Sequence, residues 1–428
     1  MKVLVTGGAG YIGSHTVRQL VKTGADVTVL DNMVYGHAGA LVDPEVKLVK
    51  GDLGDASVVY PLLMKGNFDA VIHFAAFINV GESVQNPLKY YMNNIARPLV
   101  LLGAMQAAGV KRFVFSSTCA TYGVPTQIPI PETEKQDPIN PYGSSKYMLE
   151  KVCRDCDRAW GLKSVFLRYF NASGCSEDGL IGEDHEPETH LIPNILLTLT
   201  GEKEYIEVFG TDYDTPDGTC IRDYIHVNDL ADAHLKAVDY LMKGGATECF
   251  NLGTGLGLSV REILETAEKV TGKKIPVRYG PRREGDPPRL IANPKKAKEI
   301  LGWEARCKDA GAIVETAWKW MTGPRRGHYS CLCPQKATLF SALPCPPWQG
   351  LFFQISSYAP LPEPLFLPLP ATAKNIQRQT VPGVLLLLPG FKKPFPFPSG
   401  KPGTQPVSRQ VPRSGNARPP VGYMMQPI

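Results

Sequence analysis

The sequence lacks any apolar run near the roughly twenty residues that a helix needs to cross a bilayer. The apolar stretch Val384–Leu388 is too short for this purpose. No charged and then apolar leader precedes Val3. We therefore expect neither a signal peptide nor a membrane partner.

Cysteines in metal-type spacing are also lacking, because the ten cysteines are scattered along the chain. The exception, Cys153-x-x-Cys156, falls inside a predicted helix with no second pair or histidine cluster nearby. We predict no metal site, and reduced thiols in a cytoplasmic protein.

Acidic residues are nearly absent from residues 324–428. Glu363 is the single acid there, against eleven Lys or Arg, and 21 of the 105 residues are proline. The segment carries about +10 and the whole chain +5, which leaves about −5 for residues 1–323. Without apolar periodicity it is predicted to be disordered. The segment could be a basic interaction tail or a non-native extension, and the sequence leaves both interpretations open. The positive charge of the segment would attract nucleic acid only non-specifically, so no specific nucleic-acid partner is expected.

A glycine-rich loop joins the first strand to the first helix. Lys2–Thr6 is predicted to be a buried parallel strand and residues 11–23 an amphipathic helix. Gly7 and Gly10 lie in the loop between them, and Gly13 lies in the first turn of the helix. Glycines at these positions let backbone N–H groups approach a pyrophosphate at the helix N-terminus. The next strand, residues 26–30, ends at Asp31, whose carboxylate can bind both ribose hydroxyls and would repel a 2′-phosphate. NAD is favoured over NADP; the alternative is a turn aspartate before Asn32.

Tyr142 and Lys146 stand one helical turn apart. A lysine on the same face stabilises a phenolate electrostatically, and a bound oxidised nicotinamide would add a second positive charge. The pair could then act as a general base beside a hydride acceptor. The same spacing also arises by chance, as an exposed aromatic followed by a solvated lysine.

Strands and helices alternate through the first part of the chain, which predicts an α/β fold with a doubly wound parallel sheet. A chain of 428 residues with 43% apolar residues can build two domains with real cores. We expect a nucleotide-binding domain at residues 1–170 and a smaller, mainly substrate-binding domain at residues 171–323, with segments that return to the sheet. Further strands are predicted at residues 47–50, 70–74, 112–116 and 164–168.

Two long helices, at residues 88–108 and 142–160, carry broad apolar faces. The first presents Leu99, Leu102 and Met105, and the second presents Met148, Leu149 and Val152. These faces could pack entirely within one subunit or form a homodimer through a four-helix bundle.

Together, these motifs resemble the extended short-chain dehydrogenase/reductases and, more narrowly, the bacterial UDP-glucose 4-epimerases. The resemblance covers residues 1 to about 321. It rests on Gly7–Gly13, Asp31-Asn32, Gly51–Leu53, His73–Ala76, Val80–Ser83, Tyr91–Asn94, Ser116–Thr118, Tyr142–Lys146, Arg168–Asn171, Arg222–Val227 and Arg282–Asp286.

The resemblance implies a catalytic set, a cofactor site and a substrate site. Thr118, Tyr142 and Lys146 would be catalytic. Tyr142 and Lys146 would also contact NAD, together with Gly7, Gly10, Tyr11, Ile12, Gly13, Asp31, Asn32, Asp52, Leu53, Phe74, Ala75, Asn93 and Phe170. The UDP-sugar would be held by Thr118, Asn171, Leu191, Phe209, Arg222, Arg283 and Asp286. Two arginines can neutralise a diphosphate, although Arg222 beside Asp223 could instead form a surface ion pair.

The activity implied is interconversion of UDP-galactose and UDP-glucose by transient oxidation at C4. Ile78 and His190 depart from the family pattern, where some members have lysine and asparagine, which puts two ligand contacts in doubt. A sugar-nucleotide dehydratase is the rival, but Cys119-Ala120 replaces the acid and base that it needs after the threonine. A non-catalytic NAD-binding regulator would have no reason to keep the catalytic set. Acceptance of N-acetylated UDP-hexoses is open.

Overall fold

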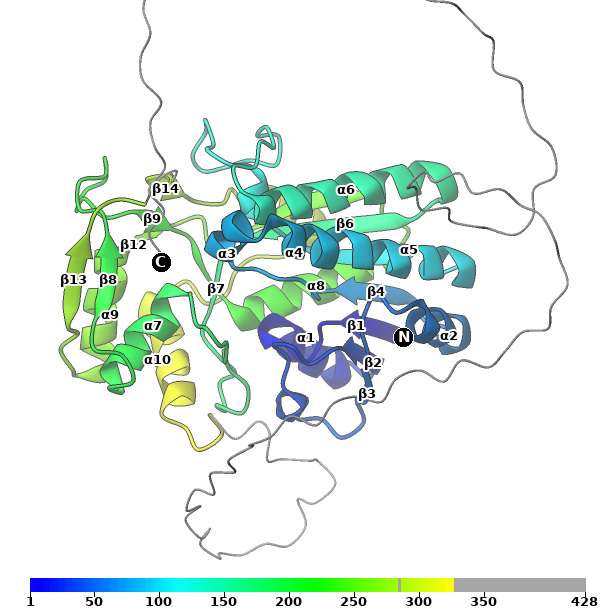
Figure 1. Cartoon of the computed structure of the whole chain (residues 1–428), viewed down its shortest axis with the longest axis horizontal. Helices are drawn as coiled ribbons and strands as arrows, with labels where there is room; N and C mark the ends of the chain where they lie inside the picture. The colour runs from blue at the N-terminus through cyan, green and yellow to red at the C-terminus, as the bar shows by residue number, and fades with distance from the viewer. Residues whose placement is uncertain (284–285, 327–428) are drawn as a thin grey trace, which may run out of the picture. The chain divides into compact units, whose positions relative to one another are not determined.

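A seven-stranded, wholly parallel sheet forms the centre of the computed structural model, which describes residues 1–283 and 286–326 (Figure 1). The strand order is β11-β6-β5-β4-β1-β2-β3. This is the predicted doubly wound α/β fold, with the order reversing beside β1. The strands are β1 (Lys2–Thr6), β2 (Asp26–Asp31), β3 (Lys47–Lys50), β4 (Ala70–His73), β5 (Arg112–Thr118), β6 (Lys163–Tyr169) and β11 (Glu248–Leu252).

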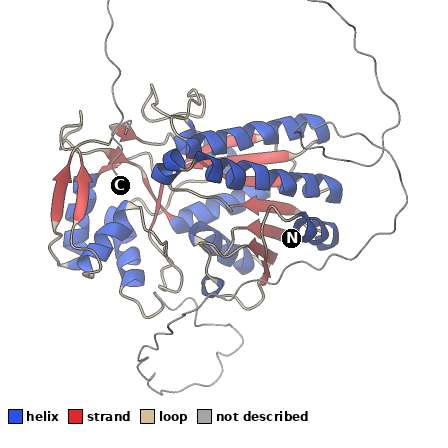
Figure 2. Ribbon diagram, in the orientation of Figure 1, coloured by secondary structure: helices blue, strands red, loops and turns tan. Residues whose placement is uncertain are grey.

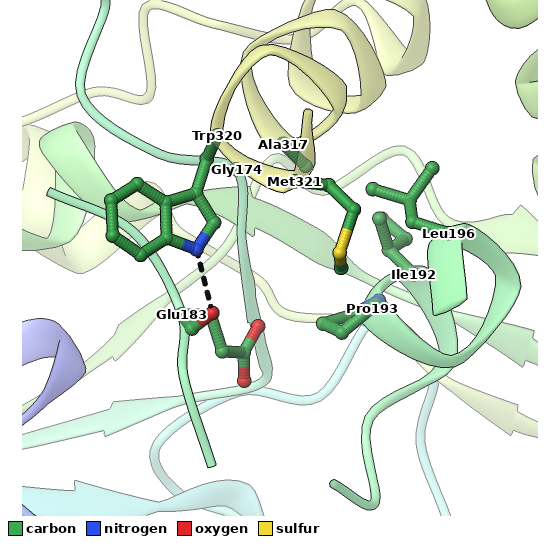
Figure 3. Close-up of a pocket in the computed structure, with 8 residues that line it drawn as sticks. All are labelled: Gly174, Glu183, Ile192, Pro193, Leu196, Ala317, Trp320 and Met321. Atoms are coloured by element: carbon green, nitrogen blue, oxygen red, sulfur yellow. Dashed lines mark hydrogen bonds between the residues drawn. The ribbon is translucent and has the colours of Figure 1, made fainter. Parts of the chain in front are cut away.

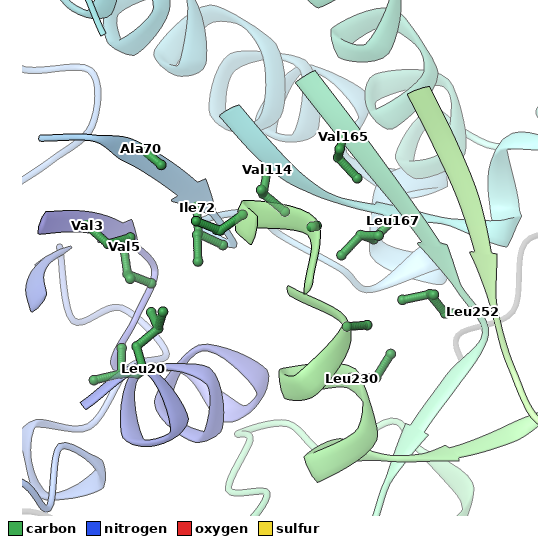
Figure 4. Close-up of a cluster of buried hydrophobic side chains, with 14 of the residues drawn as sticks. Val3, Val5, Leu20, Ala70, Ile72, Val114, Val165, Leu167, Leu230 and Leu252 are labelled. Atoms are coloured by element: carbon green, nitrogen blue, oxygen red, sulfur yellow. The ribbon is translucent and has the colours of Figure 1, made fainter. Parts of the chain in front are cut away.

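Helices cover both faces of this sheet because alternate strand residues point to opposite sides (Figure 2). Val3 and Val5 pack with Leu20 of one helix and Leu230 of another (Figure 4). Leu4, between them, packs into the core on the other face. The first face is covered by α1 (Tyr11–Lys22) and α8 (Val227–Met242), and the second by α2 (Ala56–Gly66), α5 (Arg97–Ala108) and α6 (Pro141–Trp160).

The structure confirms the six predicted strands, with ends that differ by at most two residues, and adds β11, which was not predicted. The predicted helix at residues 88–108 is present in three parts. It begins as α4 (Pro87–Tyr91), passes through a π-helical segment η2 (Met92–Ala96) and continues as α5. A π turn of this kind is common near functional sites.

A separate apolar core lies among the elements that follow the sixth strand. It is formed by α7 (Leu191–Leu199), α9 (Val260–Thr271) and α10 (Ala310–Met321) against β8 (Ile206–Phe209) and β13 (Val277–Gly280). Two segments from this region lie against the sheet: β11 pairs with β6, and Trp303 enters the core beneath α8. The division at residue 170 stays a prediction. The remaining elements are η1 (Ala38–Ala40), α3 (Val80–Gln85), η3 (Cys119–Thr121), β7 (Asn171–Ser173), β9 (Ile221–Arg222), β10 (Tyr224–His226), β12 (Leu258–Ser259), β14 (Arg289–Leu290) and η4 (Ala297–Leu301).

Among the described residues, no helix is both long and apolar enough to cross a membrane. The predicted disorder of the C-terminal extension falls outside the described residues, apart from Pro324–Arg326. In that short part, an Arg325 guanidinium N–H donates to the Gly39 carbonyl at 2.8 Å, and Arg326 forms an ion pair with Glu202.

Candidate active site

The glycine loop lies at the carboxyl end of β1 and begins α1. Gly7 has a φ of 72°, and a Cβ there would come within 2.5 Å of the Ala75 amide nitrogen. A Cβ on Gly13 would lie 2.3 Å from the Gly7 carbonyl oxygen, whereas one on Gly10 would meet nothing closer than 3.4 Å. No side chain caps the N-terminus of α1. The N-terminus of α1 and the open side of Gly10 fit a pyrophosphate.

Asp31 ends β2 beside this loop. Its carboxylate accepts hydrogen bonds from the backbone N–H groups of Ala9 at 3.0 Å and Met33 at 2.8 Å. Burial raises the pKa of the carboxyl, while these two hydrogen bonds oppose the shift. The side chain is thus fixed between the glycine loop and the turn that follows β2, where a ribose would lie.

Three further cofactor residues are joined by an arginine that the sequence analysis did not identify. The Asn32 amide donates to Asp52 Oδ2 at 3.2 Å. Arg97 Nη1 lies 3.2 Å from the same oxygen and donates to Asn93 Oδ1 at 2.8 Å. Arg97 therefore ties the ends of β2 and β3 to the π-helical segment, and Leu53 beside them is buried in the core. No local motif marks Arg97, because its charged partner, Asp52, is distant in sequence.

The loop after β4 passes directly over Gly7. The backbone N–H groups of Phe74 and Ala75 donate to the Thr6 carbonyl at 2.8 and 3.1 Å. The Phe74 ring packs at 4.5 Å from the ring of His234. Ile78 is 41% exposed at the far end of the loop. Glycine is therefore required at position 7, where the backbone of Phe74 and Ala75 passes.

The predicted catalytic residues meet at the carboxyl end of β5. Asn140 caps α6 by accepting the Gly143 N–H at 2.8 Å, which places Tyr142 and Lys146 in the first two turns. Both side chains are buried, as is Thr118 at the last position of β5. Lys146 Nζ donates to the Ser116 carbonyl at 2.9 Å and lies 5.9 Å from the centroid of the Tyr142 ring.

Burial dominates the acidity of this pair. It raises the pKa of the Tyr142 phenol, a shift to which Tyr169 adds and which a hydrogen bond with Thr118 opposes. Burial lowers the pKa of Lys146 to about 7. The protein alone thus favours a neutral phenol, and the predicted phenolate requires a further positive charge in the site.

The same helix carries a second pair with this spacing, Tyr147 and Lys151. The Lys151 Nζ lies 5.3 Å from the centroid of the Tyr147 ring, and Lys151 is exposed. Position relative to the sheet, rather than spacing, distinguishes the two pairs.

A buried polar network holds β5, α6 and β6 together beneath the catalytic residues. Glu150 accepts hydrogen bonds from Ser117 Oγ at 2.6 Å and from Arg168 Nε at 3.0 Å. Arg168 Nη1 also donates to the Tyr122 hydroxyl at 2.9 Å. These residues are buried and paired, so they fix the helix that carries Tyr142 without touching its phenol.

Four of the predicted substrate residues form one ion pair and one cation–π pair. Arg222 is buried and pairs with Asp286. The Arg283 guanidinium lies over the Phe209 ring, 4.0 Å from its centroid. The interpretation of Arg222 and Asp223 as a surface ion pair is wrong: the Asp223 carboxylate instead accepts three backbone N–H groups, from Thr254, Gly255 and Ala292.

The other three predicted ligand residues occupy element ends. Asn171 begins β7, and its N–H donates to the Asp223 carbonyl at 3.0 Å. Leu191 is the first residue of α7, next to the helix cap His190. Phe170 is buried against Tyr122 and neighbouring apolar side chains.

One small cavity lies outside these residues, between α7, α10 and the segment after β7 (Figure 3). Glu183 lines it, and close by the structure gathers Glu183, His185, Glu188 and His190. The sequence analysis missed this cluster. Its signal was the spacing Glu-x-His-x-x-Glu-x-His, four metal-ligating residues within eight positions.

Comparison with known proteins agrees with this geometry. Residues 3–253 match the NAD dependent epimerase/dehydratase family. The chain belongs to this family. It is 52% identical over 328 residues to the UDP-glucose 4-epimerase of Lactobacillus helveticus, covering 77% of this chain and 99% of that protein. The epimerase of Streptococcus mutans is also 52% identical, over 330 residues, with 77% and 99% covered.

Solved structures of the family extend the likeness to three dimensions. The UDP-glucose 4-epimerase from Brucella ovis in complex with NAD is 48% identical, with a TM-score of 0.73, and the match covers 75% of this chain and 98% of that one. The Bifidobacterium longum epimerase in complex with NAD⁺ and UDP is 39% identical, with a TM-score of 0.73 and coverage of 76% and 100%. The resemblance noted in the sequence is confirmed, and the family is NAD-dependent.

Proposed function

We propose that this family member is a UDP-glucose 4-epimerase that interconverts UDP-galactose and UDP-glucose. The observation that carries the proposal is the buried meeting of Thr118, Tyr142 and Lys146 at the carboxyl end of β5. Relatives about half identical that bear this name support it.

The residues present fit NAD. The open side of Gly10 and the uncapped N-terminus of α1 would receive the pyrophosphate, and Asp31 would accept hydrogen bonds from a ribose. Tyr11, Ile12 and Gly13 begin the same helix. One side of the NAD site, held together by Arg97, would be lined by Asn32, Asp52, Leu53 and Asn93. The other side, toward β4 and β6, would be lined by Phe74, Ala75 and Phe170. When bound, NAD supplies a hydride acceptor for the sugar C4 and a positive charge near the phenol.

The proton chemistry falls to the protein's own side chains. Tyr142 takes the proton of the C4 hydroxyl, and Thr118, hydrogen-bonded to the phenol, positions both. Lys146 is held by the Ser116 carbonyl, so its ammonium stays near the phenolate without replacing it as the base. Return of the hydride to the opposite face of C4, with Tyr142 giving its proton back to the C4 oxygen, would give the C4 epimer, and the overall reaction needs no second substrate.

The UDP moiety would be anchored on the other side of the site. Arg222 currently pairs with Asp286, and Arg283 lies over Phe209, so both guanidiniums are held by the protein where a diphosphate can bind them. Asn171 and Leu191 would complete this side. Anchoring through UDP leaves the hexose free to present either face, which epimerisation at C4 requires.

The dehydratase alternative is disfavoured by the residue after Thr118. Burial raises the pKa of the Cys119 thiol to about 12, so it cannot exchange protons readily near neutral pH. Ala120 has no titratable group. A purely regulatory NAD-binding protein is disfavoured by the intact, buried catalytic set.

We further propose a homodimer formed through α4, α5 and α6. Of the predicted apolar faces, Leu102, Met105 and Leu149 are buried within the subunit and Val152 packs against the same core, but Leu99 and Met148 are about half exposed. Leu88 and Met92 add exposed apolar area, 76% and 61% exposed. This surplus suits a helical interface. If Leu88→Glu and Met92→Glu together leave the mass in solution unchanged, this interface is wrong.

We also infer a cytoplasmic location. The seven cysteines within the described residues are all free thiols, the usual state in a reducing compartment.

The decisive test offers the purified full chain UDP-galactose without added NAD and follows UDP-glucose formation. Tightly held NAD should support turnover. UDP-N-acetylgalactosamine in a parallel reaction tests the sugar range. Absence of UDP-glucose from a protein that contains NAD would refute the assignment.

A further inference from the structure

Four metal-ligating side chains gather on the segment between β7 and α7. Each offers one ligand atom, and these atoms all lie within 4.8 Å of one another. His190 Nδ1 is 2.7 Å from Glu183 Oε1 and 3.1 Å from Glu188 Oε1, and His185 Nδ1 is 3.2 Å from Glu183 Oε1. Ligands at about 2.0–2.1 Å from a tetrahedral Zn²⁺ stand roughly 3.3 Å apart. The side chains are already close to that spacing.

The two carboxylates are enclosed, and neither contact of Glu183 Oε1 with the two histidines has hydrogen-bond geometry. The Glu183 and Glu188 side chains are each only 6% exposed. Glu183 Oε1 and His185 Nδ1 face each other at 3.2 Å without hydrogen-bond geometry, and both atoms are buried. Buried polar atoms normally have partners. A cation between these two atoms would satisfy both.

Surrounding groups orient the candidate ligands. Glu188 Oε1 accepts the backbone N–H groups of Thr189 and His190 at 2.7 and 2.8 Å. The Trp320 indole donates to the Glu183 carbonyl at 2.9 Å (Figure 3). The His185 ring meets the Tyr11 ring edge-on at 6.2 Å. Such outer contacts are what holds metal ligands in place.

We propose that Glu183, His185, Glu188 and His190 bind a divalent transition-metal ion, with Zn²⁺ the best match. Two carboxylates balance the charge of the ion, so its burial leaves no net charge. Two imidazoles favour zinc, cobalt, nickel or copper over magnesium or calcium, which prefer oxygen ligands. Without an ion, the same side chains can pair as protonated histidines with glutamates, which accounts for their assembly in either state.

The position of the site gives it a structural role. His190 occupies the N-cap position of α7, and His185 packs on Tyr11 at the start of α1. An ion would therefore tie the glycine loop to the helix that begins at Leu191. We therefore expect the ion to raise the stability of the folded protein, measured as its Tm.

Cobalt titration of the full chain, freed of metal by a chelator, tests the proposal. Co²⁺ at this site should give visible d–d absorption at one equivalent without a thiolate charge-transfer band. That distinction is needed because His328, Cys331 and Cys333 lie outside the described residues and could bind metal through sulfur. Zn²⁺ at about 100 times its Kd should raise the Tm, on the order of 5 °C.

Variants decide between this site and others. The double variant His185→Gln/His190→Gln should abolish the thiolate-free absorption and the Zn²⁺-dependent rise in Tm. Glu188→Gln should weaken the affinity for Co²⁺ and Zn²⁺ at least tenfold. His37→Gln, a nearby histidine outside the cluster, should change neither. If the double variant fails to fold, Glu188→Gln decides alone. Metal bound only with a thiolate band, or bound equally by Glu188→Gln, would overturn the proposal.

Discussion

Replacement of Tyr142 by Phe removes one hydroxyl from the centre of the site and keeps the ring that fills it. The phenol's hydrogen-bond partner is Thr118, so the loss should cost about 0.5–1.5 kcal/mol of stability. The Asn140 cap and the buried Glu150–Arg168 network are untouched. We therefore expect the fold, and the NAD that co-purifies, to be retained.

The effect on turnover should be far larger. Without the phenol, the proton of the C4 hydroxyl has no acceptor: Lys146 Nζ lies 5.9 Å from the ring centroid and is engaged with the Ser116 carbonyl. Loss of a general base costs roughly 10²–10⁴ in rate, or about 2.7–5.5 kcal/mol of activation free energy. We predict at least a 10²-fold fall in kcat for UDP-galactose.

The chain contains its own control for this experiment. Tyr147 stands four residues before Lys151 on the same helix, so Tyr147→Phe makes the same chemical change in a pair of identical spacing. It should keep kcat within about twofold of the unmodified chain, because it lies outside the site. Equal kcat values for the two variants, measured at matched NAD occupancy, would remove Tyr142 from the mechanism.

Three other perturbations have defined outcomes. Asp31→Ala should reduce the preference for NAD over NADP, measured as the ratio of the two affinities; an unchanged ratio would contradict the ribose assignment. Lys146→Met should lower kcat at least tenfold while the apo-protein keeps or gains Tm at pH 7. The pKa of Lys146 is about 7 in the folded protein, below its unfolded value, so this lysine lowers the stability of the fold. The cost is complete below pH 7 and decreases as the pH rises from 7 toward 10.5. The difference in Tm between Lys146→Met and the unmodified chain should therefore shrink over that range. Truncation after Arg326 should leave activity, NAD content and Tm unchanged. Truncation after Gly323 should cost about 1–2 kcal/mol of stability, because it removes the Arg326–Glu202 pair and the Arg325–Gly39 hydrogen bond. A large loss after Arg326 would show that later residues pack onto the enzyme.

Local sequence patterns predicted the parts of the fold that local chemistry determines. The strand-glycine-helix unit and the acid that ends β2 lie where the spacing placed them, because only glycine fits beside Ala75 and the Gly7 carbonyl. Elements whose identity depends on distant partners were missed. The edge strand β11 pairs with β6 from about eighty residues away, and Arg97 becomes informative only when β3 and the π-helical segment meet.

Charge states in the site were the least predictable feature, and the reason is burial. Spacing places Lys146 one turn from Tyr142 and correctly makes them neighbours, but it equally pairs Lys151 with Tyr147. Near the end of β5, desolvation raises the phenol's pKa and lowers that of the lysine, opposite to what a solvated pair would show. In the proposed mechanism, the Tyr142 phenol would therefore gain acidity when a cation lies beside it. Such an arrangement would couple proton abstraction by Tyr142 to the presence of oxidised NAD, which would supply a positive charge near the phenolate as well as a hydride acceptor.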